Sequence, residues 1–370
     1  MQQIILLSNN GAIPKYSIVH VIDRLHTGGA ERVLVTLANI FFRHGHKVKV
    51  VTIAEQGPLS AQLLPGIEQV NLGRKFKFDP LIMRRLVKEV KGFDVVHVHS
   101  FFNLRYLWLA KMLFGLKKPV FYHEHLGLRA VMQPTADQKY ILPKTIFIAT
   151  TEAIHNWATN QIRIPLKNVF TLPNIIIKEQ VKPVEKKNDG AVKLVLVSNI
   201  RNEKNIEFGI TLMQQLNKTS VLYHLTIVGK LYDKAYYEKL QQLIQETGTQ
   251  SYISFIHDAD NVQQLLPQFD IGLHTSPSES GPLAVIEYIA RALPFVAYNT
   301  GEVITSIKNE LPGCIAYTFD TSEWINKIQQ LLQADAAVLK QQMQSVFEKH
   351  FYVEGYYQHC LAIYAAGLAK

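Results

Sequence analysis

Two glutamates, Glu279 and Glu287, bracket a segment whose residue types suit the binding of an activated sugar. Residues 276–282 read Ser-Pro-Ser-Glu-Ser-Gly-Pro, which predicts a loop followed by a helix that begins near Pro282. Free N–H groups at a helix start hold phosphate oxygens, and a carboxylate accepts hydrogen bonds from both hydroxyls of a diol. We interpret Glu279 as a hexose ligand and Glu287 as a ribose ligand, although this spacing also occurs on solvated helix faces. The candidate positions for the donor phosphates are Gly281, Pro282 and Leu283.

A cationic segment, Ile-Arg-Asn-Glu-Lys at residues 200–204, follows a predicted strand. Arg201 and Lys204 are candidates for neutralising a diphosphate, because their side chains donate charge-assisted hydrogen bonds to phosphate oxygens. The competing interpretation is a charged loop in solvent, where such side chains contribute little. If a nucleoside diphosphate departs here, Lys204 is also a candidate catalytic residue, since it stabilises the charge that develops.

Gly28 and Gly29 follow the predicted strand 18–23 and precede a predicted helix. Glycine at such a turn lets the backbone approach a bulky anionic ligand, and the helix start offers N–H groups. A tight strand-to-helix turn without ligand is the competing interpretation. The dinucleotide-binding fingerprint is excluded, because its third glycine is missing.

Two pairs of histidines stand two positions apart, His97 with His99 and His123 with His125. Residues i and i+2 of a strand share a face, so each pair offers two of the three or four ligands that zinc needs. Polar residues bonded to their neighbours at strand ends are the alternative. We favour one imidazole that lines a ligand site and expect no metal. The two aspartates of residues 258–260 also suit a cation, but we interpret them as a cap of the helix that follows.

These residues lie at the ends of strands in two successive series of alternating strands and helices. Strands are expected at 18–23, 47–54, 94–99, 120–125 and 145–149, and then at 192–198, 222–228, 252–256, 270–274 and 294–298. Helices are expected from Ala30 to about Gly45, over 206–216, from about 282 to 291, and over 351–368. The alternation predicts parallel sheets with right-handed crossovers, in which ligands bind beyond the carboxyl ends of the strands. The charged segment 178–190 is typical of a linker between two domains.

The composition is that of a globular two-domain protein. The chain has 370 residues, of which 48% are hydrophobic and 19% charged. Its two cysteines match no ligand spacing and suit a reducing compartment. Residues 1–7 have no basic start or cleavage site, and no apolar run spans a bilayer. We therefore expect a cytoplasmic protein, either soluble or peripheral at the inner face of the membrane.

The net charge of +9 is unevenly distributed along the chain. Residues 1–176 carry 22 lysines and arginines against 10 aspartates and glutamates, whereas the remaining residues carry 17 against 20. A basic first half indicates an anionic partner. Nucleic acid is disfavoured because no nucleic-acid-binding module is recognisable, and an acidic membrane surface or a phosphate-bearing acceptor fits better. Residues 79–90 resemble a basic amphipathic membrane helix, or else a helix that covers a sheet with a solvated outer face.

Taken together, the pieces resemble glycosyltransferase family 4 over about residues 18–368. The matching segments are Gly28-Gly-Ala-Glu-Arg32, Asp94-Val-Val-His97, His125, Thr171-Leu-Pro-Asn174, and Glu279 with Glu287 in the family's E-x7-E spacing. The family's Gly-Arg pair aligns with Ser198-Asn199, so one phosphate-clamping arginine is absent and Arg201 is the candidate substitute. Ser280-Gly281-Pro282 replaces the commoner Gly-Phe-Gly type of loop.

The resemblance implies an α/β protein of GT-B architecture, with two Rossmann-like doubly wound domains facing a cleft. The expected acceptor-binding domain is 1–176 plus a helix at about 355–370 that crosses back to it, and the donor-binding domain is 177–354. Gly28, Gly29 and His97 then become candidates for acceptor binding, and His125 with Glu279 and Lys204 for catalysis. No cofactor or metal is implied.

The implied reaction is the retaining transfer of a hexose-type sugar from a nucleotide sugar to a hydroxyl of a glycan or a lipid-linked acceptor in cell-surface polysaccharide synthesis. Two alternatives stay open. A nucleotide-sugar 2-epimerase would share the architecture but needs no second substrate. A catalytically inactive scaffold that binds a nucleotide sugar is favoured only by the departure at Asn199.

Overall fold

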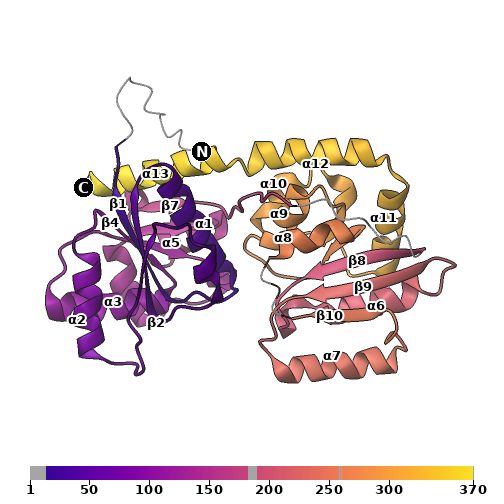
Figure 1. The fold of residues 1–370 in the computed structure, drawn as a ribbon, viewed down its shortest axis with the longest axis horizontal. Coiled ribbons are helices and arrows are strands. Elements are labelled where there is room, and N and C mark those ends of the chain that lie inside the picture. Colours follow the sequence, from indigo (N-terminus) through magenta and orange to yellow (C-terminus); the bar gives the residue numbers. More distant parts are fainter. Residues whose placement is uncertain (1–13, 182–189, 258, 260, 370) are drawn as a thin grey trace. The chain divides into compact units, whose positions relative to one another are not determined.

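The computed structural model describes residues 14–181, 190–257, 259 and 261–369, and the chain divides into two compact units. The first unit contains the described residues up to Ile175 together with those from Val353 onward, and the second is Ile176–Tyr352. Each unit is built around its own parallel sheet (Figure 1). Among the described segments, no helix combines the length and apolar character needed to cross a bilayer. The predicted pair of Rossmann-like domains is thus confirmed.

The sheet of the first unit has seven strands in the order β3-β2-β1-β4-β5-β6-β7. The order reverses between β1 and β4, and such a switch point is where doubly wound sheets bind ligands. Expected strand limits agree with the observed ones to within about one residue, but β3 and β7 were not predicted because they are short and carry no long apolar run. The strands are β1 Ser17–Arg24, β2 Lys47–Glu55, β3 Glu68–Asn71, β4 Val95–His99, β5 Val120–Glu124, β6 Ile146–Ala149 and β7 Val169–Thr171.

Helices cover both faces of this sheet. One face carries α1 and α13, and the other packs against α2, α3 and α5 in a continuous apolar core. The helices are α1 Gly29–Arg43, α2 Pro80–Val90, α3 Phe101–Phe114, α4 Ala136–Ile141, α5 Glu152–Asn160 and α13 Val353–Leu368.

The apolar side of α2 is part of this core, which corrects the interpretation of residues 79–90 as a helix that lies on a membrane by its apolar side. The Asp79 side chain accepts the N–H of Ile82 and caps the helix start. Ile82, Leu86 and Val90 are buried against the sheet, and burying each such side chain stabilises the fold by about 1.5–3 kcal/mol. Arg84 and Lys88 lie on the exposed side. The apolar face is therefore not available to lipid.

The C-terminal helix α13 returns to the first unit, as the resemblance implied. Tyr357 and Tyr364 are fully buried. The Tyr364 hydroxyl lies 2.7 Å from Nδ1 of His97, and the Tyr357 hydroxyl lies 2.9 Å from Nε2 of His46. These hydrogen bonds satisfy phenol groups that would otherwise be costly to bury. The tyrosines of the tail thus hold α13 against the sheet.

The second unit has six parallel strands in the order β10-β9-β8-β11-β12-β13, with its switch point between β8 and β11. Its strands are β8 Ala191–Val197, β9 Leu222–Val228, β10 Ile253–Ile256, β11 Ile271–His274, β12 Phe295–Tyr298 and β13 Ile315–Ala316. Its helices are α6 Ile206–Leu216, α7 Lys234–Glu246, α8 Val262–Leu265, α9 Leu283–Ala290, α10 Gly301–Ile307, α11 Thr321–Gln333 and α12 Ala336–His350. The aspartates at 258 and 260, interpreted from sequence as helix-capping residues, lie outside the described residues.

Candidate active site

Lys204 and Glu279 come together at the switch point of the second sheet. Lys204 ends a short turn after β8, and Glu279 follows β11, the neighbouring strand. The Nζ atom of Lys204 lies 2.5 Å from Oε1 of Glu279, and both side chains are mostly buried. The two residues are 75 positions apart in the sequence. The fold thus places a paired cation and carboxylate where doubly wound sheets bind ligands.

Hydrogen bonds to the backbone fix the loops that carry this pair. The Thr275 hydroxyl donates to the carbonyl of Lys204 at 3.1 Å. On the other side, the N–H of Glu279 donates to Oγ1 of Thr300 at 3.2 Å, and the N–H of Glu302 donates to the carbonyl of Ser280 at 2.7 Å. The loop after β11 is therefore braced from both sides, which preorganises the carboxylate for a ligand.

The electrostatic surroundings keep Glu279 ionised. Burial is the largest single influence and raises the pKa of its carboxyl, but the Lys204 ammonium, the nearby His274 and the hydrogen bonds from Lys204 and Ser276 together outweigh burial and hold that pKa below its ordinary value. His274 at the end of β11 lies 3.9 Å from the same carboxylate oxygen. Burial lowers the pKa of His274 to about 4, so the ring is neutral. His274 was not predicted, although its place as the last residue of an apolar strand was a usable signal.

Helix α9 is anchored so that its first turn follows Glu279 closely. Pro282 is the N-cap residue, one position earlier than the first-turn place expected for it, and Gly281 and Leu283 flank it. The Tyr288 hydroxyl accepts the N–H of Val197 at 3.0 Å and donates to a carbonyl of β11 at 3.1 Å. Its ring fills the space over Gly272, where any side chain would collide with it.

Glu287 is the other carboxylate of the predicted pair, and it lies in the second turn of α9. Its side chain is buried, with 4% of its surface exposed. An ionised carboxylate at such a position needs hydrogen-bond donors. The ribose-binding role predicted for Glu287 stays a prediction.

Arg201 lies at the same edge of the sheet but does not contact the pair. Its guanidinium carbon stacks 4.1 Å from the ring centroid of Tyr232, and its NH1 atom lies 3.8 Å from Glu203. Lys230, which follows β9, places its ammonium 5.6 Å from the same ring. Lys230 was not predicted, because it stands in no recognisable motif. Asn199 accepts the N–H of Lys230 at 3.4 Å and so braces the adjoining loop where the family has arginine.

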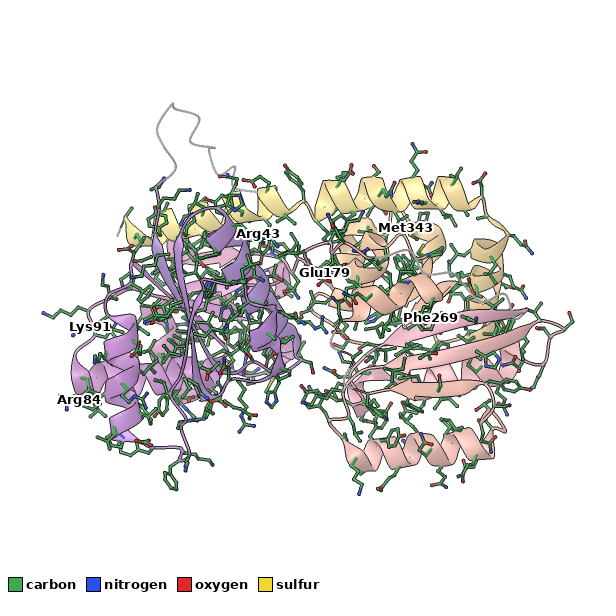
Figure 2. All side chains as sticks on the ribbon, viewed as in Figure 1. Arg43, Arg84, Lys91, Glu179, Phe269 and Met343 are labelled. Carbon is green, nitrogen blue, oxygen red and sulfur yellow. The ribbon has the colours of Figure 1, made fainter. Side chains whose placement is uncertain are left out.

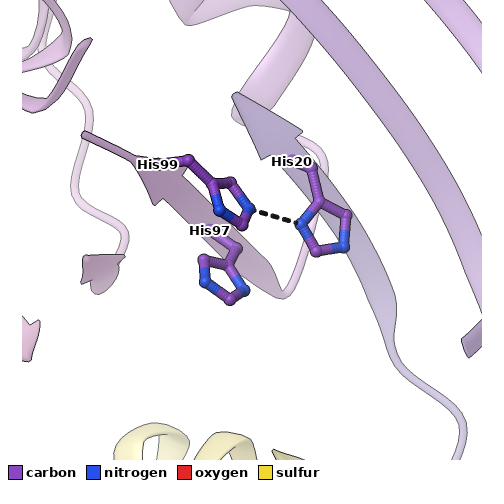
Figure 3. A group of neighbouring side chains, drawn as sticks. All are labelled: His20, His97 and His99. Carbon is purple, nitrogen blue, oxygen red and sulfur yellow. Dashed lines mark hydrogen bonds between the residues drawn. The ribbon is translucent and has the colours of Figure 1, made fainter. Parts of the chain in front are cut away.

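In the first unit, strand register gathers five histidines on the face covered by α1 and α13. His20 of β1 pairs with His97 of β4, and His99 pairs with His123 of β5. His125 follows β5. Figure 3 shows His20, His97 and His99, with the bond of 3.1 Å between Nδ1 of His20 and Nε2 of His99. A second bond of 3.0 Å joins Nδ1 of His99 to Nε2 of His125. Three imidazoles therefore form a chain from the core to the half-buried His125.

The donor-to-acceptor direction of the hydrogen bonds among these three imidazoles is assigned from the innermost ring, His20. Nε2 of His20 is buried and has no partner among the described residues, and an unpaired lone pair there costs less than an unpaired N–H. His20 then donates from Nδ1 to His99, and His99 donates from Nδ1 to His125. This arrangement leaves the proton of His125 on its own Nδ1. With this assignment of the protons, His125 presents a hydrogen-bond donor on its free nitrogen.

The clustered rings also form two possible donor sets for a metal ion. Nitrogens of His20, His97 and His99 lie within 4.8 Å of one another, and so do those of His99, His123 and His125. Neutral imidazoles in threes suit zinc-type ions. In both sets, however, a nitrogen of His99 already shares a proton with a neighbouring ring. We therefore favour the hydrogen-bonded cluster.

Two acceptor-site candidates have different surroundings. His97 is fully buried, and its Nδ1 bonds the Tyr364 hydroxyl. Helix α13 covers the ring, and the acceptor contact expected for His97 stays a prediction. Gly28 is the N-cap residue of α1 and Gly29 the first helical residue, so the helix begins one position earlier than expected. A side chain at Gly28 would meet the carboxylate of Glu31.

Acid should destabilise the first unit, because its histidine cluster is buried in the neutral state. Burial lowers the pKa of His20 and of His125 from 6.5 to about 3, and lowers that of His99 well below its ordinary value. Below about pH 6.5 the histidines of the unfolded chain bind protons that the buried rings of the folded chain do not bind. The contribution of these rings to the free energy of unfolding is therefore fully present above this pH, and it is lost as the pH falls toward about 3. Each such ring contributes up to about 1.4 kcal/mol per pH unit.

The measurement is the urea midpoint, followed by circular dichroism from neutral pH to about pH 5. Replacing His123 by phenylalanine should reduce the dependence on pH, whereas replacing the exposed His257 should leave it unchanged. A midpoint that stays constant over this range would contradict the neutral cluster.

Comparison with known proteins places the chain in a family. Residues 27–180 match the model described as Glycosyltransferase Family 4, and residues 177–346 match Glycosyl transferases group 1. The putative glycosyltransferase EpsF of Bacillus subtilis is 22% identical over 75% of this chain and 78% of its own length. N-acetyl-alpha-D-glucosaminyl L-malate synthase of Bacillus anthracis is 22% identical over 83% of this chain and 85% of its own.

A solved structure shares the fold over almost its whole length. Anabaena HepE, in complex with UDP and glucose, superimposes with a TM-score of 0.78 and 17% identity, covering 93% of this chain and 98% of its own. The two family models together span residues 27–346 and so include both units. The chain therefore belongs to glycosyltransferase family 4 and has the two-domain GT-B fold.

Proposed function

We propose that the protein transfers a hexose-type sugar from a nucleotide sugar to a hydroxyl of a glycan or lipid-linked acceptor, with retention of anomeric configuration. The observation that carries this proposal is the buried Lys204–Glu279 pair at the switch point of the second sheet, beside the first turn of α9. A cation and a helix start suit a diphosphate, and a fixed carboxylate suits sugar hydroxyls. The UDP and glucose bound by the similar HepE structure favour a ligand of the same chemistry.

The second unit would bind the donor. Lys204 and Arg201, with the N–H groups near Gly281, Pro282 and Leu283, would stabilise the charge that develops on the departing diphosphate. Glu279 would orient the hexose, and Glu287 would accept hydrogen bonds from the ribose.

The first unit would bind the acceptor, with Gly28 and Gly29 at the start of α1. The acceptor hydroxyl would attack the anomeric carbon on the face from which the diphosphate leaves, and its proton would pass to the departing phosphate. The transition state has oxocarbenium character. His125 would donate a hydrogen bond to the hexose. We assign the product to cell-surface polysaccharide synthesis.

Transfer would proceed without a bound metal. Lys204, Arg201 and Lys230 lie at the ends of β8 and β9 and supply positive charge of the kind that a divalent cation provides in metal-dependent transferases. On this proposal, turnover survives exhaustive chelation.

A panel of nucleoside diphosphates and nucleotide sugars tests the donor assignment. We expect at least one nucleotide to raise the thermal midpoint, because a ligand at 100 times its dissociation constant stabilises the folded state by about 2.7 kcal/mol. The stabilising nucleotide sugar is then incubated with the protein alone. A transferase leaves it intact or hydrolyses it slowly, and NMR of the product formed with an acceptor reports the anomeric configuration.

Other results of this experiment contradict the proposal. Conversion of the donor into its 2-epimer in the absence of acceptor indicates an epimerase. Binding without transfer to any glycan or lipid-linked acceptor indicates a scaffold. If no nucleotide of the panel changes the thermal midpoint of unfolding, the proposed donor site is contradicted as well.

A further inference from the structure

Nearly all of the chain's net charge lies in one segment of the first unit. Residues 71–120 contain eleven lysines and arginines against three aspartates and glutamates, whereas the whole chain carries a net charge of +9. The three acids are engaged within the unit, since Asp79 caps α2, Glu89 pairs with a lysine of β2, and Asp94 accepts hydrogen bonds from the first residue of β1. The segment therefore presents a strong positive potential to any anionic partner.

The basic side chains of α2 follow one another along its outer side. Figure 2 shows Arg84 and Lys91 directed away from the sheet, and both are exposed. The side chains that form this basic row are Arg84, Arg85, Lys88 and Lys91. Lys75 and Lys77 precede the helix and are exposed as well.

Exposed apolar side chains stand directly beside these charges. Helix α3 packs against α2 (Figure 1). Its exposed side presents an apolar row to solvent. The apolar row consists of Phe102, Leu109, Met112 and Leu113, and 66% of the Met112 side chain surface is exposed. Phe76 and Leu81, on the segment that leads into α2, are 70% and 75% exposed. Apolar groups gathered in this way on a folded surface are typical of a binding site.

Contacts within the unit hold these elements together as one surface. The guanidinium of Arg74 lies 4.6 Å from the ring centroid of Phe102. The Tyr106 hydroxyl donates to the carbonyl of Asp79 at 3.1 Å. The segment 74–81 is thus fixed against α3, so its exposed side chains do not depend on a free loop.

We propose that this surface, formed by residues 74–81 and the outer sides of α2 and α3, docks onto an anionic lipid bilayer. The basic row meets the headgroups, and the apolar row with Phe76 and Leu81 enters the acyl region. Lysines and arginines near an anionic membrane each strengthen binding, and buried apolar area adds to it. A nucleic acid fits less well, because only Phe76 and Phe102 of the exposed apolar residues named here could stack on bases, whereas Leu81, Leu109, Met112 and Leu113 are aliphatic.

Vesicle flotation of the full-length protein tests the surface without any sugar transfer. We expect the protein to float with vesicles of phosphatidylcholine mixed with phosphatidylglycerol. With vesicles of phosphatidylcholine alone, it should remain in the bottom fraction. Added salt should release the protein from the anionic vesicles. Arg84→Glu combined with Lys88→Glu should lower the partition coefficient at least about tenfold. Met112→Ser combined with Leu113→Ser should lower it about fivefold or more at unchanged charge.

Matched controls lie elsewhere on the chain. The charge control is the double variant Lys234→Glu with Lys239→Glu. It reverses two charges on the exposed side of α7, as Arg84→Glu with Lys88→Glu does on α2. Leu166→Ser with Val338→Ser repeats the loss of exposed apolar surface. Both controls should float like the parent protein. Unchanged circular dichroism and nucleotide-induced thermal shift in every variant show that the fold and the donor site persist.

A tryptophan on α3 reports insertion directly. Trp108 is partly exposed, whereas Trp157 and Trp324 are buried. Brominated acyl chains should quench the emission of the parent protein and lose that effect in Trp108→Phe. The proposal is overturned if neither kind of vesicle binds, if the α7 pair matters as much as the α2 pair, or if single-stranded DNA is retained where anionic vesicles are not.

Discussion

Replacing Lys204 by alanine is expected to lower turnover at least about 100-fold, which corresponds to about 2.7 kcal/mol of lost transition-state stabilisation. The Lys204 ammonium lies 2.5 Å from Glu279 at the carboxyl edge of the second sheet, where a donor diphosphate would depart. The loss should appear mainly in kcat, because the charge of the leaving group develops in the transition state. Steady-state kinetics with the identified donor, together with calorimetry of nucleotide binding, measures the two contributions separately.

The controls for Lys204 separate charge from structure. Lys204→Arg keeps the positive charge and should lose less activity than the alanine variant. Lys234→Ala removes a lysine that is 84% exposed on α7 and should leave kcat unchanged. Turnover of the alanine variant close to that of the parent would remove Lys204 from the mechanism.

Replacing Glu279 by alanine is the second substitution with a large expected effect, again at least about 100-fold in turnover. The carboxylate is ionised and mostly buried, and the loop that carries it is fixed by a hydrogen bond from the backbone N–H of Glu279 to Oγ1 of Thr300. It therefore offers preorganised acceptor oxygens to sugar hydroxyls. Its removal also leaves Lys204 without its partner. Glu279→Gln keeps the shape but not the charge, and should be impaired as well.

Glu279 and Lys204 should not act independently. Because their side chains are bonded, the double variant Lys204→Met with Glu279→Gln should lose less activity than the product of the two single losses. Glu238→Gln, on the exposed side of α7, serves as the carboxylate control and should leave turnover unchanged. Strictly multiplicative losses would show that the two side chains act independently, and that the bond between them has no part in turnover.

Local sequence pattern predicted most of the elements, because buried parallel strands are short apolar runs with clear ends. The helix Ile206–Leu216 and the strand Leu222–Val228 were expected with their observed limits. The strand Glu68–Asn71 was missed, because three of its four residues are exposed and it carries a single valine. Hydrophobic periodicity carries no signal in such an edge strand.

The site was only partly predictable, since its geometry depends on which strands are neighbours. Lys204 and Glu279 were chosen separately for their chemistry, but their contact follows from the adjacency of β8 and β11 in the sheet. Likewise, the spacing of His97 and His99 predicted a shared face, whereas the addition of His20 required the register of β1 against β4. Sheet order and register are tertiary properties that residue spacing does not encode.

The C-terminal helix has a consequence for biosynthesis. The tyrosine-rich tail completes the first unit, and yet it is translated after the whole of the second. While the ribosome is still adding the second unit, the face of the sheet that carries His97 and Phe121 lacks its cover, because Tyr364 packs against both rings. The amino-terminal half of the nascent chain must therefore wait for the final residues before its core closes, and during that interval it offers a natural target for chaperones.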